Sequence, residues 1–237
     1  MRKGTSENKQ TGSCDMTRFH QQEASKGSQK WIQVLVNHKK DVINKEIRTS
    51  LQLPENETIE WFSPLESENF KEYKDEEFLV KLGINLKGVK LHEFWPRSGP
   101  RWDALAKSSS GKLILVEAKS HITELMSDFR GNNQTSINQI QNSLNATKRR
   151  FGVKESYDWT KLFYQYANRI AHVNWLSKQG YDARLINLYF LNDKEMEGPQ
   201  TKEEWRGALR LMHRCLGLRE HLIRDLGFDL FIDVKTL

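Results

Sequence analysis

Three charged residues, Asp103, Glu117 and Lys119, lie within residues 101–119, RWDALAKSSSGKLILVEAK, and are of types that bind metals and phosphates. Asp103 is near the start of one strand-like run, while Glu117 and Lys119 alternate within a second, very apolar run. The Ser/Gly-rich stretch between the runs has the composition of a hairpin loop. Because side chains alternate along a strand, we expect Glu117 and Lys119 on the same face.

The length of the turn decides whether Asp103 joins that face. If the loop covers residues 108–112, Lys107 pairs with Leu113 and the register places Asp103 opposite Glu117. Directly opposed residues have Cβ atoms roughly 5 Å apart, so two carboxylates and an ammonium group would converge. A slip of one residue would send Asp103 to the opposite face, and the sequence leaves that alternative open.

This combination of side chains suits metal-dependent hydrolysis of phosphodiesters. Two neighbouring carboxylates raise each other's pKa unless a cation lies between them, and Mg²⁺ commonly binds one or two carboxylates with water and phosphate. The metal lowers the pKa of a bound water, while a nearby lysine orients that water or offsets charge on the phosphate. The alternative is an exposed hairpin with a solvated Glu117–Lys119 pair. The run LILV before Glu117 instead favours a buried strand, where charges need partners.

The arrangement of Asp103 on one strand and Glu117-Ala118-Lys119 on the next resembles the motif of the PD-(D/E)xK nuclease superfamily. Trp102 stands where that motif usually has a proline. The resemblance implies a restriction-endonuclease-like core and a Mg²⁺-dependent deoxyribonuclease, with Mn²⁺ as a substitute metal. It also implies that Asp103, Glu117 and the backbone carbonyl of Ala118 hold the metal, and that Lys119 lies beside the attacking water.

The resemblance extends over about residues 60–193. The segments that carry it, similar to mostly uncharacterised bacterial members, are WFSPLESENFKEYKDEEFLVKLG, FWPRSGPRWDALA and FYQYANRIAHVNWLSKQGYDARLINLYFLND. It implies a restriction, defence or repair role on DNA, and a homodimer would suit it because one site cuts one strand. Two alternatives stay open. One is a catalytically silent nucleic-acid- or protein-binding module on the same fold, and the other is a structural protein with incidental carboxylates.

A further carboxylate is expected before the hairpin, because members of the superfamily often draw another acid from the preceding helix. We predict a helix over about residues 66–82, with Glu72, Asp75, Glu76 and Glu77 as the candidates. Glu72 is favoured as the catalytic one because it lies within a segment that resembles relatives. The alternative for each of these residues is an acidic, solvated helix face.

Substrate contacts are predicted in two further segments. Gln165, Arg169 and His172 fall at helical spacing and form one polar stripe. We assign this stripe, with Gln165 and Arg169 as the nucleic-acid-binding residues, to the substrate backbone or the active site. An ordinary amphipathic helix is the alternative. Arg97 and Arg101 flank the first strand of the hairpin and are predicted to contact phosphates.

The charge distribution favours a polyanion as partner. The 237 residues carry a formal net charge of +6, yet residues 55–77 hold nine acidic residues against two lysines. The remainder is therefore strongly basic, which favours DNA. There is no apolar run of membrane-span length and no secretory signal, so we predict a cytoplasmic protein without membrane association. Two distant cysteines support neither a disulfide framework nor a cysteine-bound zinc.

An α/β fold with a mixed central sheet flanked by helices is expected to position these residues. Residues 1–27 are polar and lack periodicity, so we predict a flexible tail followed by a single nuclease-like domain over 28–237. Apolar spacing and turn signals predict helices over about 31–51, 66–82, 134–150, 159–178 and 201–216, and strands over 88–95, 101–107, 113–120, 183–191 and 228–237.

Overall fold

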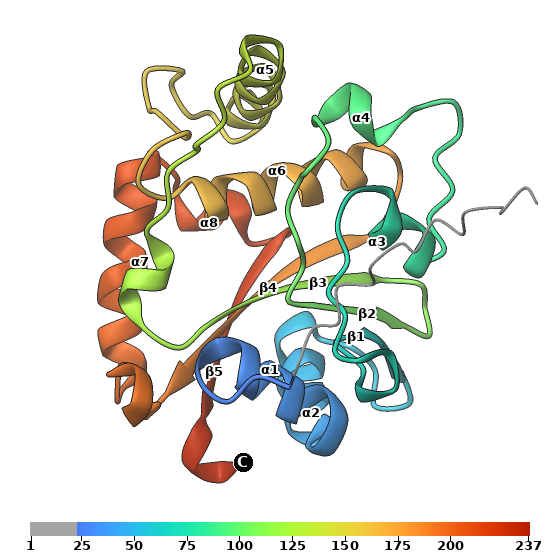
Figure 1. The fold of residues 1–237 in the computed structure, drawn as a ribbon, viewed down its shortest axis with the longest axis vertical. Helices are drawn as coiled ribbons and strands as arrows, with labels where there is room; N and C mark the ends of the chain where they lie inside the picture. Colours follow the sequence, from blue (N-terminus) through green and yellow to red (C-terminus); the bar gives the residue numbers. More distant parts are fainter. Residues whose placement is uncertain (1–22) are drawn as a thin grey trace, which may run out of the picture.

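A computed structural model describes residues 23–237, so most of the predicted tail lies outside the described residues. The chain forms an α/β fold whose central sheet is flanked by helices, as predicted (Figure 1). The strands are β1 (Ile59–Ser63), β2 (Ala104–Ser108), β3 (Leu113–Lys119), β4 (Ala183–Leu191) and β5 (Gly227–Asp233). The helices are α1 (Gly27–His38), α2 (Lys40–Leu51), α3 (Asp75–Lys81), α4 (Leu91–Phe94), α5 (Gln134–Arg150), α6 (Tyr164–Lys178), α7 (Lys202–Leu216) and α8 (Glu220–Ile223).

The sheet is mixed, with its strands in chain order β1-β2-β3-β4-β5. β1, β2 and β3 are antiparallel neighbours, whereas β4 runs parallel to β3 and β5 parallel to β4. Within the hairpin, Lys107 pairs with Leu113 and Ala104 pairs with Val116, which is the predicted register. Asp103 directly precedes β2, so continuing that register places it opposite Glu117.

Helices cover both faces of the sheet. On one face α1 and α2 pack against Ile114, Val116 and Ala118 of β3 in an apolar cluster. On the other face Leu113 and Leu115 join a cluster that includes α6, α5 and α7. All seven residues of β3 are buried, as expected for a strand covered on both sides. Glu117 and Lys119 share the side of Leu113 and Leu115, so they face the α6 layer.

One predicted strand was wrong, and one observed strand was missed. Residues 88–95 contain the short helix α4, where the buried residues Leu91 and Trp95 are four positions apart and the residues between them are more exposed. This is helical spacing rather than strand alternation. The missed strand is β1, at one edge of the sheet, whose buried residues alternate with more exposed ones over only five positions. A pattern this short did not stand out against the preceding turn residues.

Three predicted helices have different bounds. The helix over 31–51 is interrupted at Lys39, whose backbone leaves the helical region between α1 and α2. Only Asp75–Lys81 of the segment 66–82 forms the α-helix α3, because Asn69 and Phe70 adopt left-handed backbone angles. α6 begins at Tyr164 rather than 159. In contrast, the capping box that begins α7 is present, with the Thr201 hydroxyl accepting a hydrogen bond from the Glu204 N–H.

None of the helices described over residues 23–237 has the length and apolar character needed to span a membrane.

Candidate active site

The predicted hairpin residues lie together at the end of β3. Glu117 and Lys119 point from the end of this strand toward α6 and are only 5% and 8% exposed. Asp103 is partly buried at the entrance to β2, and its Oδ2 accepts a hydrogen bond of 2.7 Å from the Ala118 N–H. The sequence left two registers of the hairpin open. The observed register is the one that brings the two acids and the lysine into one cluster.

Glu117 is the centre of this cluster. Its Oε1 accepts a hydrogen bond from the Lys119 ammonium, and its Oε2 accepts one of 2.5 Å from Nε of Arg169. Burial alone would raise the pKa of Glu117, but the charges and hydrogen bonds of Arg169 and Lys119 hold it below its ordinary value. Glu117 is therefore anionic at neutral pH, and both of its oxygens have a fixed direction.

Arg169 is held in place by hydrogen bonds from the two terminal nitrogens of its guanidinium group. One terminal nitrogen donates to the Arg101 carbonyl at 2.7 Å, and the other donates to Oδ1 of Asn168 at 2.9 Å. The group also lies over the Trp102 ring, 5.0 Å from its centroid. The planar guanidinium donates to several acceptors at once. Arg169 thereby joins α6 to Glu117 of β3 and to the segment that leads into β2.

Asp103 has the opposite electrostatic character. Burial and then the negative charge of Glu117 raise the pKa of Asp103 well above its ordinary value, and Glu72 adds to the effect. Lys119 and the Ala118 N–H act against this rise without cancelling it. The anionic form of Asp103 is thus the least favourable charge in the cluster.

Lys119 remains protonated. Burial would lower the pKa of Lys119, but Glu117 and Asp103 together raise it above its ordinary value. Glu124 contributes to the same effect, and its Oε2 accepts a hydrogen bond of 3.4 Å from the Ser120 N–H. Glu124 was not predicted from the sequence, because nothing in its spacing from the hairpin marks it as a neighbour of the lysine.

Glu72 lies beside this cluster, although not on a helix. It belongs to the segment before α3 and is brought toward the hairpin by a β-bridge between Tyr73 and Trp102. Glu72 is buried, and its Oε1 accepts a hydrogen bond of 3.2 Å from Gln29. The other three candidate acids have different partners: Asp75 accepts from the backbone of Gly99, Glu76 lies near His92, and Glu77 pairs with Lys71.

The polar stripe predicted on α6 is largely buried rather than an exposed edge. Arg169 and His172 are 4% and 1% exposed, and Gln165 is partly buried beside a small cavity that also contacts Glu117 and Lys119. Burial among the rings of Phe94, Trp95 and Trp102 lowers the pKa of His172 to about 3. The stripe therefore faces the site and the core, which spacing alone could not distinguish from a solvated face.

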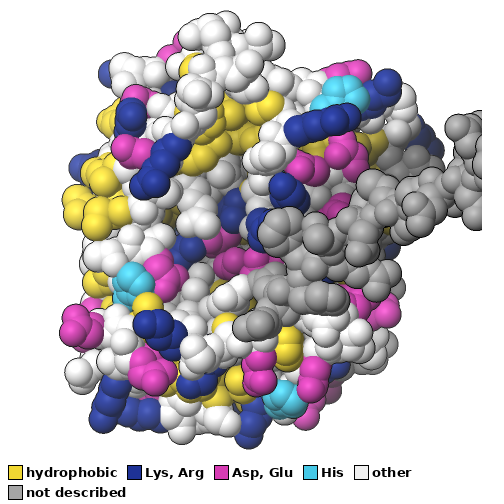
Figure 2. Space-filling model, in the orientation of Figure 1, with side chains coloured by type: hydrophobic (Ala, Val, Ile, Leu, Met, Phe, Trp, Pro, Cys, Tyr) yellow, Lys and Arg dark blue, Asp and Glu magenta, His cyan; other side chains and the backbone are white. Residues whose placement is uncertain are grey.

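Arg97 and Arg101 are the exposed cations nearest to the hairpin in sequence. Both side chains are exposed on the segment between α4 and β2. The Arg101 carbonyl is the group that Arg169 binds, so the Arg101 backbone is fixed while its side chain remains in solvent. Lys and Arg side chains are otherwise interspersed with Asp and Glu over the face of the molecule in Figure 2.

The donor set fits a hard divalent cation. Among the described residues there is no group of three or more His, Cys, Asp or Glu arranged as a ready-made metal site. Mg²⁺ does not need one, because it commonly uses one or two carboxylates and fills its other positions with water and substrate phosphate. The carboxylates of Asp103 and Glu117 converge near the Lys119 ammonium, and the raised pKa of Asp103 indicates that its negative charge is the least well offset.

Comparisons with known proteins do not assign a function. No protein-family model, curated protein or solved structure matches the chain. The chemistry is therefore inferred from the cluster itself, from its position on the sheet and from the resemblance of the hairpin motif.

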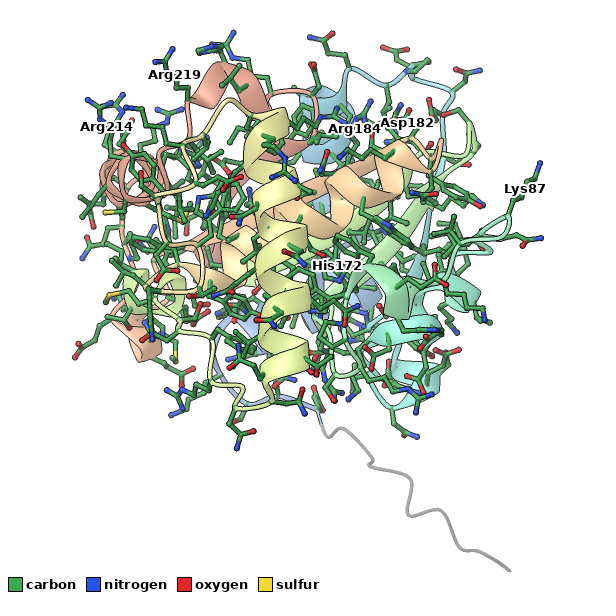
Figure 3. All side chains as sticks on the ribbon, turned by 90° about the horizontal axis from the view of Figure 1, so that it is seen from above. Lys87, His172, Asp182, Arg184, Arg214 and Arg219 are labelled. Atoms are coloured by element: carbon green, nitrogen blue, oxygen red, sulfur yellow. The ribbon has the colours of Figure 1, made fainter. Side chains whose placement is uncertain are left out.

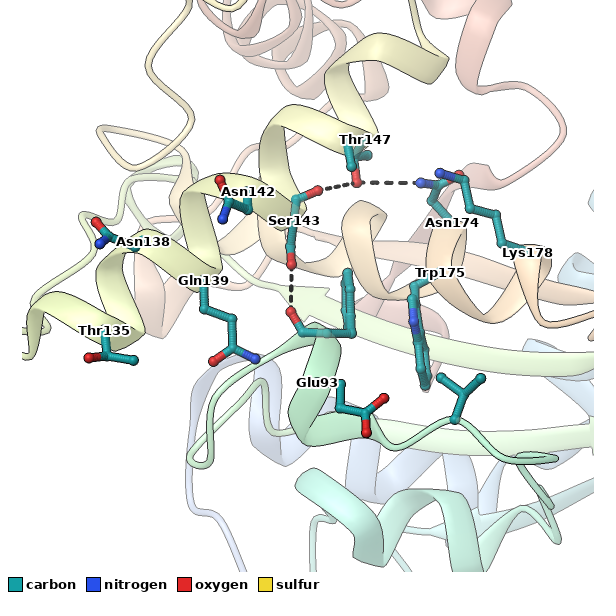
Figure 4. A pocket seen from close by; sticks show the side chains of 13 residues that line it. Glu93, Thr135, Asn138, Gln139, Asn142, Ser143, Thr147, Asn174, Trp175 and Lys178 are labelled. Atoms are coloured by element: carbon teal, nitrogen blue, oxygen red, sulfur yellow. Dashed lines mark hydrogen bonds between the residues drawn. The ribbon is translucent and has the colours of Figure 1, made fainter.

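A sizeable cavity is separate from the charged cluster. A hollow of about 610 Å³ lies between α4, α5 and α6 (Figure 4). Its wall on α5 carries neutral polar side chains, including Asn138, Gln139 and Asn142, and Trp175 of α6 faces them. Glu93 and Lys178 are its charged lining residues, so it has no paired acids and does not contribute to the proposed chemistry.

Proposed function

We propose that the protein is a metal-dependent nuclease that hydrolyses phosphodiester bonds in DNA, with Asp103, Glu117 and Lys119 as its catalytic residues. One observation carries the proposal: two carboxylates and a protonated lysine converge from adjacent antiparallel strands, and the negative charge of Asp103 is only partly compensated. A solvated surface pair has no reason to be buried in this way.

The strand order supports the same assignment. An antiparallel hairpin carrying the acids, followed by helical structure and a strand parallel to β3, is the arrangement expected of a restriction-endonuclease-like core. The second of the two helices between β3 and β4, α6, supplies Arg169, which fixes the orientation of Glu117. We infer a role in restriction, defence or repair, and DNA rather than RNA, from the resemblance of the hairpin motif alone.

Each residue has a distinct role in this proposal. Asp103, Glu117 and the Ala118 carbonyl would hold Mg²⁺, which when bound supplies an acidic water and polarises the phosphoryl group. Lys119 is a hydrogen-bond donor rather than a general base, because its raised pKa keeps it protonated. It therefore orients the attacking water and offsets charge on the phosphate. Exposed Arg97 and Arg101 would bind the phosphates of the strand.

The experiment is cleavage of supercoiled and linear DNA, and of RNA, with Mg²⁺, Mn²⁺ or EDTA. Wild type should cleave DNA only with a divalent cation, and Lys119→Met should reduce the rate by about 10²- to 10³-fold. Lys112→Met is the matched control, because Lys112 begins the same strand region but pairs with Asp182 away from the cluster. Equal cleavage by folded Lys119→Met and wild type would contradict the catalytic scheme.

A second candidate is a nucleic-acid-binding module without catalysis. The observation that favours it is the double pairing of Glu117 with Lys119 and Arg169, which a purely structural ion cluster would also show. This candidate predicts DNA binding in EDTA without cleavage under any metal condition. It also predicts no effect of Mg²⁺ on thermal stability, whereas a metal bound only by the native state must stabilise it.

A further inference from the structure

A second cationic region lies at the C-terminal end of α7 and around α8. It contains Arg210, Arg214, Arg219 and Arg224, and we call these four residues the arginine surface. All four side chains are exposed. Figure 3 shows Arg214 and Arg219 at one corner of the molecule, away from the labelled His172 of α6. None of the four lines the cavity beside Glu117.

The arginine surface borders two adjoining hollows of about 340 and 470 Å³. Arg214 and Arg219 line both of them, so the hollows form one continuous feature. Lys154 and His221 add further basic groups, and no described lining residue of either hollow is acidic. A concave surface lined by one sign of charge concentrates ligands of the opposite sign.

These arginines have no acidic partner among the described residues. No described carboxylate is within ion-pair distance of any of the four. Some other arginines of the described surface do form ion pairs, namely Arg149–Glu155, Arg184–Asp182 and Arg206–Glu203, whereas exposed ones such as Arg97 and Arg150 do not. Arg206 is on the same helix as Arg210 and Arg214, so the change from paired to unpaired cations occurs along α7. Cations complement a helix C-terminus, but Arg219 and Arg224 lie beyond α7 and that effect does not explain them.

An exposed aromatic ring lies within the same feature. Tyr157 is 38% exposed and lines one of the hollows with Lys154, Arg214 and Arg219. Its ring packs directly on the backbone of Gly217, where a Cβ atom would come within 2.6 Å of the ring. Gly217 also has a φ of +67°, so two independent features favour glycine there and leave room for the ring.

The base of the arginine surface is packed against the core. The buried Trp159 donates a hydrogen bond of 2.8 Å to the Leu216 carbonyl and so joins the segment that carries Tyr157 to the end of α7. Leu218 and Ile223, on either side of Arg219, are buried. The segments that carry Tyr157 and Arg214 are therefore joined to each other beneath the surface.

We propose that the arginine surface binds a single-stranded segment of nucleic acid, with its guanidinium groups on phosphates and Tyr157 stacked on a base. A basic groove interleaved with an exposed aromatic ring is how proteins bind single strands without reading sequence. Paired phosphate oxygens match the planar fork of arginine. The preference for nucleic acid over another polyanion rests on the proposed function and on Tyr157, while the charge alone would suit any polyanion.

The test measures binding separately from cleavage. A fluorescently labelled oligothymidine is titrated with full-length protein in EDTA, and anisotropy is recorded over a range of salt concentrations. Wild type is compared with Arg214→Ala/Arg219→Ala, and with a charge-matched control, Lys40→Ala/Lys45→Ala, whose exposed lysines lie on α2. Thermal unfolding of each variant verifies that the fold is intact.

We expect the arginine double variant to bind at least about 10-fold more weakly at low salt, with the slope of log K against log salt reduced by about 0.7 for each phosphate that the variant no longer binds. The lysine control should stay within about 3-fold of wild type, since charge far from the bound strand is screened. Tyr157→Ala should weaken single-strand binding by at least about 5-fold and duplex binding much less.

Three results would overturn the proposal. They are equal weakening by both double variants, unchanged binding in the arginine variant, or equal dependence on these arginines when polyglutamate replaces the oligonucleotide. The same experiments distinguish failure of this inference from failure of the proposed function. Arginine-dependent binding in EDTA without cleavage in Mg²⁺ would reject the nuclease and keep this inference. Cleavage together with binding that does not depend on the arginines would keep the nuclease and reject this inference.

Discussion

The molecule carries cations in two very different settings. In the candidate active-site cluster, Lys119 and Arg169 are at most 8% exposed and both donate to Glu117. On the arginine surface, Arg214 and Arg219 are exposed and have no described acidic partner. A buried charge must be paired, because desolvation of an isolated ion is very unfavourable, whereas water solvates an exposed one.

The two settings suit two different tasks, the positioning of reacting groups and the binding of a ligand. Pairing fixes the direction of every group around Glu117, which suits chemistry that depends on position. Unpaired surface arginines are free to exchange their counterions for phosphates, which suits binding with strong salt dependence. Changes in the buried cluster should therefore alter stability or catalysis, and changes on the arginine surface should alter binding alone.

Removing a buried cation should have the largest effect on stability. Arg169→Ala leaves Glu117 buried with Lys119 as its remaining cation, so we expect the free energy of unfolding to fall by about 3–5 kcal/mol. Denaturant unfolding without divalent cations measures this change. Arg149→Ala, which breaks an exposed pair with Glu155, is the control and should cost no more than about 1 kcal/mol. Similar losses in the two variants would mean that burial does not distinguish the pairs.

The buried, neutral His172 should make stability depend on pH. Its pKa is about 3 in the folded protein and about 6.5 when exposed. Between these values the unfolded state binds a proton that the native state does not, so stability is full above about 6.5 and falls by about 1.4 kcal/mol per pH unit on acidification.

His172→Phe keeps an aromatic ring among the same neighbouring rings. It should remove most of the decrease in stability on acidification that we assign to His172. Unfolding measured at several pH values for wild type and His172→Phe tests this. The exposed His221→Gln variant should follow the wild-type curve. A wild-type slope in His172→Phe would show that other groups produce the acid sensitivity.

Neutralising Asp103 should change the free energy of unfolding less than the changes above, and it should stabilise the protein. The raised pKa of Asp103 means that stability is lost as the pH rises from its unfolded value through its folded value, because the native state favours the protonated form. Asp103→Asn imitates that form and retains an acceptor for the Ala118 N–H. At neutral pH without metal, we expect it to be more stable than wild type by about 1 kcal/mol and inactive. A less stable variant would show that Asp103 is already well compensated.

The arginine surface should have the smallest effect on folding. Arg214→Ala/Arg219→Ala removes two exposed side chains without described ion pairs, so its free energy of unfolding should stay within about 0.5 kcal/mol of wild type. The same denaturant series as for Arg169→Ala gives this value. A loss comparable to that of Arg169→Ala would mean that these arginines are structural, and it would remove the contrast between the two regions.

Local sequence patterns predicted much of the sheet and the hairpin. A loop over residues 108–112 predicted the observed pairing of Lys107 with Leu113, although the sequence left a slip of one residue open, and the apolar run before Glu117 correctly indicated a strand buried on both faces. Both signals operate within a few residues, where alternation and turn chemistry determine structure. The capping box of α7 was equally local and was also correct.

Contacts between distant segments could not be predicted in this way. Arg169 lies 52 residues from Glu117, and spacing showed only that it belonged to a polar stripe, not that the stripe would be buried. Glu72 reaches the cluster through the Tyr73–Trp102 bridge, although a helix was expected there. These placements depend on how the layers pack, which no local pattern reports.

The most direct test of the charge imbalance at Asp103 is thermal unfolding with and without Mg²⁺, at matched ionic strength, for wild type and Asp103→Asn. If the cluster binds a divalent cation, Mg²⁺ will raise the wild-type Tm by about 2–4 °C for each kcal/mol of binding free energy and leave Asp103→Asn nearly unchanged. No shift in wild type, or an equal shift in both proteins, would contradict a metal site at Asp103 and Glu117.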